Sequence, residues 1–138
     1  LMPEYVVQIV AKALNAAEHS IRSSRILILG LAYKSNVDDT RDSPSFELIE
    51  LLAEEGANID FFDPHVDIIP KMRKYPELIG KKSVEWNEET IGGFDLVLIS
   101  TAHDSVNYAE LGKWAKVIVD TRNAMAKVDI VEAAVYRA

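Results

Sequence analysis

Three cationic side chains occupy positions in this sequence from which they could bind a phosphate group. Lys34 and Arg41 belong to a polar stretch that follows an apolar run, and Arg122 follows another apolar run near the C-terminal end. The chain has a net charge of -7, so an anion site needs a few cations in defined positions together with backbone dipoles. The pattern predicts that these side chains bind a diphosphate.

A strand-helix-strand pattern is expected to position the first two cations. The apolar run 25–30 is typical of a strand buried on both faces of a parallel sheet. Ser43 followed by Pro44 has the residue types of a helix N-cap and of the first helical position, which predicts a helix over 44–55. With a second strand at 58–62, these elements form a βαβ unit with a right-handed crossover.

The rest of the chain continues the alternation of strands and helices. The expected elements are a short helix over 68–74, an edge strand over 83–86, a helical turn from Asn87, strands over 94–100 and 116–120, a helix over 108–114 and a helical C-terminal segment. This alternation predicts an α/β fold, a Rossmann-like, doubly wound parallel sheet with helices on both faces. With the strand order 3-2-1-4-5, the loops after the first, fourth and fifth strands share one rim, and that rim carries all three cations.

A long, strongly apolar helix is predicted to precede the sheet, from Pro3 to about Glu18. Its apolar residues follow the helical spacing: Val6, Val7, Val10, Ala13, Leu14 and Ala17. Two interpretations carry equal weight on the pattern alone. The helix is the end of an element cut from a longer protein, or it is a native N-terminal helix that packs on its own domain.

The phosphate-site residues also have alternative interpretations. Gly30 lacks the second and third glycines of the dinucleotide fingerprint, so it supports NAD binding by this domain only weakly. Lys34 and Arg41 could instead be solvated charges that neutralise the neighbouring aspartates.

Other polar residues suggest weaker hypotheses. Asp63 ends the second strand and could bind a ribose, although an Asp-Pro pair more often forms a turn that ends a strand. His103 beside Asp104 could be a general base, but a histidine in a surface loop is favoured over that role. His19 and His65 have no partners at metal-ligand spacing, so no metal site is predicted.

Length and composition exclude several classes of protein. A chain of 138 residues is long enough for one domain with its own core, and it has no cysteine for a disulfide, a thiolate zinc site or a nucleophile. No apolar run reaches the roughly 18 residues of a membrane span. The acidic balance argues against nucleic-acid binding. The cytoplasm is the expected compartment.

Several short motifs resemble the C-terminal domain of the UDP-glucose/GDP-mannose dehydrogenase family. They are Gly-Leu-Ala-Tyr-Lys at 30–34, Asp-Asp-Thr-Arg-Asp-Ser-Pro at 38–44, Phe-Asp-Pro at 62–64 and Val-Asp-Thr-Arg-Asn at 119–123. Thr-Ala-His at 101–103 is most similar to the UDP-N-acetylhexosamine 6-dehydrogenase branch, with UDP-glucose 6-dehydrogenase second. The resemblance covers nearly the whole chain.

The resemblance implies a division of labour between two halves of an enzyme. Such enzymes oxidise the C6 alcohol of a UDP-sugar to the uronate in two NAD-dependent steps, through a thiohemiacetal on a cysteine that lies, with the NAD domain, before the present stretch. No catalytic residue is therefore expected in this chain, which alone should be inactive. By the same resemblance, Tyr33, Lys34 and Arg122 contact the UDP-sugar, Arg41 reaches NAD on the other domain, and Asp63 is structural.

The resemblance also implies domains and partners. Residues 1–20 resemble the end of the central interdomain and dimerisation helix, and 21–138 resemble the UDP-sugar-binding domain. The expected partners are the UDP-sugar, the N-terminal NAD-binding domain of the same polypeptide and a second copy of the protein. The alternative is a stand-alone nucleotide-binding regulatory or interaction module without catalysis. The sequence does not distinguish UDP-N-acetylglucosamine, UDP-N-acetylmannosamine and UDP-glucose as the substrate.

Overall fold

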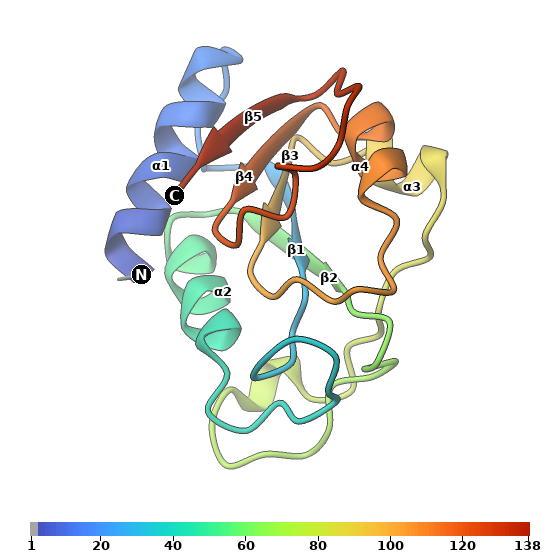
Figure 1. Ribbon diagram of the computed structural model, residues 1–138. Coiled ribbons are helices and arrows are strands. Elements are labelled where there is room, and N and C mark those ends of the chain that lie inside the picture. The colour runs from blue at the N-terminus through green and yellow to red at the C-terminus, as the bar shows by residue number, and fades with distance from the viewer. Residues whose placement is uncertain (1–2) are drawn as a thin grey trace.

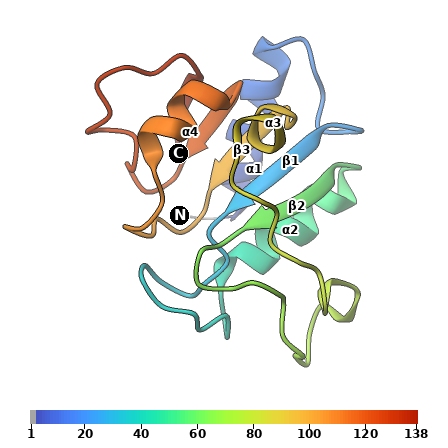
Figure 2. The ribbon, with the colours of Figure 1, turned by 90° about the vertical axis from the view of Figure 1, so that its right-hand side faces the viewer.

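One sheet of five parallel strands forms the centre of the computed structural model, which describes residues 3–138. The strands are β1 (Arg25–Leu29), β2 (Asn58–Phe62), β3 (Leu96–Ile99), β4 (Val117–Asp120) and β5 (Ala134–Arg137), in the order β2-β1-β3-β4-β5. Helices α1 (Pro3–Ala16) and α2 (Pro44–Glu54) cover one face, and α3 (Glu88–Gly92) and α4 (Tyr108–Trp114) cover the other (Figure 1 and Figure 2).

The predicted Rossmann-like α/β fold is confirmed. The chain passes from β1 to β2 on one side and later places β3 on the other side of β1. This reversal is the switch point outside which ligands bind in doubly wound sheets. The strands predicted at 25–30, 58–62, 94–100 and 116–120 correspond to β1, β2, β3 and β4, and the helices predicted at 44–55 and 108–114 correspond to α2 and α4.

The predicted edge strand at 83–86 is not formed, so β2 is the edge of the sheet. The segment makes a single backbone bond to this strand, from the Val84 N–H to the Phe61 carbonyl at 2.9 Å. Trp86 instead packs on Phe62 and Trp114, with ring centroids 4.9 and 5.9 Å away. Aromatic packing on the α4 side of the sheet therefore replaces strand pairing here.

The helical prediction for the C-terminal segment is also wrong. Residues 134–137 form β5, which pairs in parallel with β4, and turns rather than a helix connect the two strands. The carbonyl of Gly112 in α4 accepts the N–H groups of Glu132 and Ala133 at 2.9 and 3.0 Å. These bonds deliver the chain to the open edge of β4, where the β-branched and aromatic side chains that follow favour a strand.

The short helix predicted over 68–74 is absent as well. Ile68 instead forms an isolated antiparallel bridge with Lys82, and a 3-10 helix, η1 (Pro76–Leu78), follows. Pro70 has no N–H to donate and its ring clashes with a preceding helical turn, which disfavours a helix at this point.

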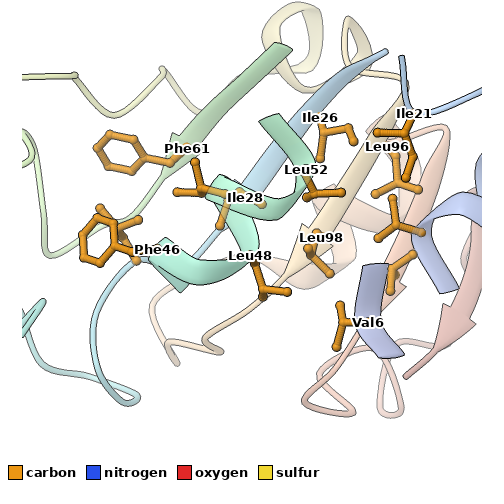
Figure 3. Packing of buried hydrophobic residues seen from close by; sticks show 14 of the residues in the cluster. Val6, Ile21, Ile26, Ile28, Phe46, Leu48, Leu52, Phe61, Leu96 and Leu98 are labelled. Carbon is orange, nitrogen blue, oxygen red and sulfur yellow. The ribbon is translucent and has the colours of Figure 1, made fainter. Parts of the chain in front are cut away.

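The apolar stripe of α1 packs within the domain. Val6, Val10, Ala13 and Leu14 are at most 3% exposed and join the core that α2 forms with the sheet (Figure 3). The buried face of this helix therefore packs on its own domain, an arrangement that both interpretations of the helix allow. The described helix has 14 residues, and Leu1 and Met2 lie outside the described residues. Among residues 3–138, no helix combines the length and apolar character needed to cross a membrane.

Candidate functional site

Gly30 directly follows β1 at the switch point, where the chain comes into close contact with the segment after β3. Its φ is +91°, and a Cβ at this position would lie 2.2 Å from the backbone oxygen of Thr101. Only glycine fits both the left-handed conformation and the close approach. The Thr101 hydroxyl then donates to the Ala32 carbonyl at 2.8 Å, so the loops after β1 and β3 form one rim, as predicted.

Asp63 fixes the start of the loop that follows β1. Its Oδ2 accepts the backbone N–H groups of Leu31 and Ala32 at 2.7 and 3.0 Å, and its Oδ1 accepts that of His65 at 2.8 Å. The side chain is fully buried at the end of β2. Asp63 is therefore structural, as the resemblance implied, and the carboxylate is not available to bind a ribose.

Both sequence-based hypotheses for His103 are wrong. The residue is completely buried rather than on the surface. Its Nδ1 accepts the Asn36 N–H at 2.7 Å, which places the ring proton on Nε2, where it donates to Asp63 Oδ2 at 2.9 Å. With both nitrogens engaged and no access to solvent, the ring cannot serve as a general base.

Tyr33 and Lys34 project from the loop that these contacts hold. Both are exposed, with 51% of the Tyr33 surface accessible. Within residues 3–138, Lys34 forms no salt bridge. The ammonium group thus remains available to an anion.

Arg41 forms a two-pronged ion pair with Asp39. Its Nε donates to Oδ1 at 3.1 Å and its Nη2 to Oδ2 at 2.8 Å, although 87% of the arginine side chain is exposed. Hydrogen bonding from the Arg41 side chain lowers the pKa of the Asp39 carboxyl to about 2. Arg41 is thus a solvated cation that neutralises a neighbouring aspartate, as the alternative interpretation predicted, but its Nη1 is not engaged by this pair.

Arg122 lines a small pocket of about 160 Å³ where α1, α2, β3 and β4 meet. Its Nε donates to the Ser100 carbonyl at 2.9 Å. Its backbone N–H donates to Oδ1 of the buried Asp120, whose carboxylate also accepts the N–H groups of Ala124 and Met125. The turn after β4 is therefore fixed, and with it the base of the arginine.

The N-terminus of α2 contributes less to this site than the sequence suggested. The Ser43 Oγ accepts the Ser45 N–H at 3.3 Å, and Pro44 has no N–H. The helix therefore offers a favourable dipole but few free donors, and the cations must provide most of the attraction for a phosphate.

A larger cavity of about 770 Å³, missed in the sequence, surrounds Arg41. Its further cations are Lys71, Arg73 and Lys74, and Phe46 stacks on Tyr75 in its wall with ring centroids 5.5 Å apart. The available signal in the sequence is the charge run over 71–74, which lies within the segment predicted as a helix.

The predicted residues thus share a rim but line different parts of it. Pro44 borders both cavities, Arg122 lines the smaller one and Arg41 the larger one, and Tyr33 and Lys34 line neither of them. Among residues 3–138 there is no group of His, Cys, Asp or Glu able to hold a metal ion. The site is a cationic rim suited to an anionic ligand.

Comparisons with known proteins identify the family of this chain. A UDP-N-acetyl-D-mannosamine dehydrogenase of Methanococcus maripaludis is 38% identical over 104 residues, covering 75% of this chain and 21% of that protein. The structure of a UDP-D-ManNAc dehydrogenase from Pyrococcus horikoshii matches with a TM-score of 0.72 at 27% identity, covering 96% of this chain and 30% of that one. For a UDP-glucose dehydrogenase from Pyrobaculum islandicum the TM-score is 0.67 at 30% identity, covering 93% and 28%.

This chain therefore spans less than a third of the length of each of these relatives. Residues 27–127 match the model of the UDP-glucose/GDP-mannose dehydrogenase family, UDP binding domain. The resemblance stated from the motifs is confirmed. The chain belongs to this family and corresponds to its UDP binding domain.

Proposed function

We propose that this chain binds the UDP part of a UDP-sugar for an NAD-dependent 6-dehydrogenase, which oxidises the C6 alcohol of the sugar to the uronate. The observation that carries the proposal is Arg122, held beside the start of α2 at the carboxyl ends of β3 and β4 in a chain of the UDP binding family. A fixed guanidinium at this place suits a diphosphate.

Tyr33 and Lys34 complete the proposed UDP-sugar site. The tyrosine ring offers an exposed flat surface and a hydroxyl, and the lysine supplies a second positive charge. Because relatives named for different UDP-sugars match this chain, the part that it recognises is proposed to be the shared nucleotide rather than the sugar.

Arg41 is proposed to contact NAD that another domain holds. NAD, when bound, accepts the hydride from C6. The present residues fit only a peripheral contact, because Gly30 stands without the other glycines of the dinucleotide fingerprint. The Nη1 donors of Arg41 are free of the Asp39 pair and suit a phosphate or ribose oxygen.

The remaining chemistry is proposed to lie in the rest of the polypeptide. The sequence has no cysteine to form the covalent intermediate, which supports the proposal that this part alone is inactive. An N-terminal NAD-binding domain, a second copy of the complete protein and a cytoplasmic location complete the proposal.

Calorimetric titration of UDP into the chain tests the site. We expect weak binding that Lys34→Ala or Arg122→Ala reduces at least tenfold, since each removes a charge-assisted contact worth about 1.5–3 kcal/mol. Lys113→Ala, which removes an exposed cation of α4, is the matched control and should bind like the parent chain. Absence of uridine nucleotide binding in the complete enzyme as well would contradict the site assignment.

A further inference from the structure

Residues 33–35 form a short exposed span between two anchored points. On one side, the N–H groups of Leu31 and Ala32 donate to buried Asp63. On the other side, the Asn36 N–H donates to buried His103. Three exposed residues, including Tyr33 and Lys34, thus lie between fixed ends in a loop without regular secondary structure, in which the Tyr33 N–H also donates to the Asp39 carbonyl.

Asn36 is a strong anchor because it docks by backbone and side chain together. Its Nδ2 donates to Asp104 Oδ2 at 2.9 Å, and its Oδ1 accepts the Asp104 N–H at 2.8 Å. Its φ of 63° is left-handed, which asparagine tolerates better than most residues. With the bond to His103, three hydrogen bonds join this residue to the loop after β3.

The charge of Asp63 makes the two anchors depend on one another. Its Oδ2 accepts three N–H groups, from Leu31, Ala32 and the His103 ring. Both the carboxylate and the ring are fully buried. Moving the loop away would leave a buried carboxylate short of donors, which costs much more than the loss of an exposed hydrogen bond. The network therefore favours one loop conformation.

We propose that Asp63 and His103 are positioning residues for nucleotide binding, acting by holding the span 33–35 in the conformation that presents Tyr33 and Lys34. The inference rests on the proposed UDP site. A span ordered before binding loses less conformational entropy when the ligand arrives, so the pair raises affinity without touching the nucleotide. This anchor requires the tautomer of His103 that carries its proton on Nε2. A proton on Nδ1 would face the Asn36 N–H and remove the acceptor of that hydrogen bond.

Two substitutions separate the two bonds of the ring. In His103→Asn the amide oxygen reaches the place of Nδ1 and can still accept from Asn36, whereas in His103→Gln the amide lies near the place of Nε2 and can still donate to Asp63. We expect UDP affinity of the chain to fall roughly tenfold in His103→Gln, equivalent to one lost hydrogen bond, and less in His103→Asn. Asn36→Gly, at an exposed position whose φ suits glycine, tests the same anchor without disturbing the interior.

Hydrogen exchange without nucleotide tests the anchor independently of UDP. The Asn36 amide should exchange slowly in the parent chain and in His103→Asn, and faster in His103→Gln. Imidazole nitrogen spectra should show the proton of His103 on Nε2. Ile91→Ala, in the core on the α3 side, is the control for general destabilisation, and it should lower thermal stability without changing exchange at Asn36.

The outcomes distinguish this inference from the proposed function. If the parent chain and the complete enzyme fail to bind UDP while exchange follows the expected pattern, the proposed function fails and the anchor stands. If UDP binds equally well to His103→Gln and Asn36→Gly although the backbone amide of residue 36 exchanges faster in both variants, the inference is overturned. Fast exchange of Asn36 in the parent chain would overturn it directly.

Discussion

Two long irregular connections leave neighbouring strands at the same rim, and they are stabilised differently. The β1–α2 connection (30–43) is fixed chiefly by two buried polar side chains from the loops that follow the neighbouring strands, Asp63 after β2 and His103 after β3. The β2–α3 connection (63–87) folds back on itself through backbone bonds, such as those between Ile69 and its neighbours Gly80 and Lys81.

The difference indicates what each connection is suited to. The first holds two exposed side chains on a short span at the switch point, where small displacements would matter for a ligand. The second presents Lys71, Arg73 and Lys74 within 68–82, a stretch beyond Asp63 where the described backbone groups are bonded to one another rather than to buried polar side chains. The first connection is therefore suited to hold individual side chains in defined positions, and the second is suited to supply positive charge without such defined positions.

Substituting alanine for one glycine in each connection should give the largest contrast. Gly30 and Gly80 both have positive φ, but a Cβ would clash with the Thr101 backbone at Gly30 and meets nothing within 4 Å at Gly80. We expect Gly30→Ala to lower the free energy of unfolding by about 3–5 kcal/mol and Gly80→Ala by about 1 kcal/mol. Urea denaturation measures both, and equal losses would remove the proposed distinction between the connections.

The next largest contrast should come from two aspartates, the buried Asp63 that follows β2 and the partly exposed Asp60 within β2. Asp63→Ala leaves buried N–H groups unpaired, so we expect a loss of about 3 kcal/mol. Asp60 pairs with Lys81 of the second connection at 3.1 Å, but more than a third of each side chain is exposed, so Asp60→Ala should cost about 0.5 kcal/mol. Thermal unfolding compares them, and a loss for Asp60→Ala as large as that for Asp63→Ala would contradict the comparison.

The smallest effect should come from loss of the exposed ion pair between Asp39 and Arg41 in the first connection. The Arg41 hydrogen bond lowers the pKa of this carboxyl to about 2, from an ordinary value of 3.8. The ion pair should therefore be fully formed above the ordinary pKa and be lost as the pH falls through about 2. A carboxyl NMR titration should show this low midpoint, and Arg41→Ala should return it towards the ordinary value. An unchanged titration midpoint in Arg41→Ala would show that the arginine is not what lowers the pKa of the Asp39 carboxyl.

The sequence predicted the elements whose signals are local. An apolar run identified β1, and Ser43 with Pro44 identified the start of α2, since a strand buried on both faces and a capped helix need little outside their own residues. The C-terminal strand was missed because its formation depends on the free edge of β4 and on bonds to Gly112, which come from elsewhere in the chain.

The candidate site was predictable only in part for the same reason. The rim could be expected from strand order, and it carries the predicted cations. The pairing of Asp63 with His103 joins residues 40 positions apart, and neither residue type indicates burial. A usable signal existed, since β2 and β3 flank β1, so the residues that follow them must flank the loop after β1. The roles of Tyr33, Lys34, Arg41 and Arg122 stay predictions.

The carboxylate of Asp63 also has a consequence for how the chain folds. The donors to its Oδ2 come from positions 32, 31 and 40 residues away along the sequence, on both sides of β2. This oxygen cannot be fully compensated until β1, β2 and β3 have assembled, and contacts of such separation form slowly because the entropy cost of chain closure precedes their gain. The loop therefore becomes ordered only when the sheet around it is complete. An ordered position of Tyr33 and Lys34 therefore indicates that the sheet of that chain is completely folded.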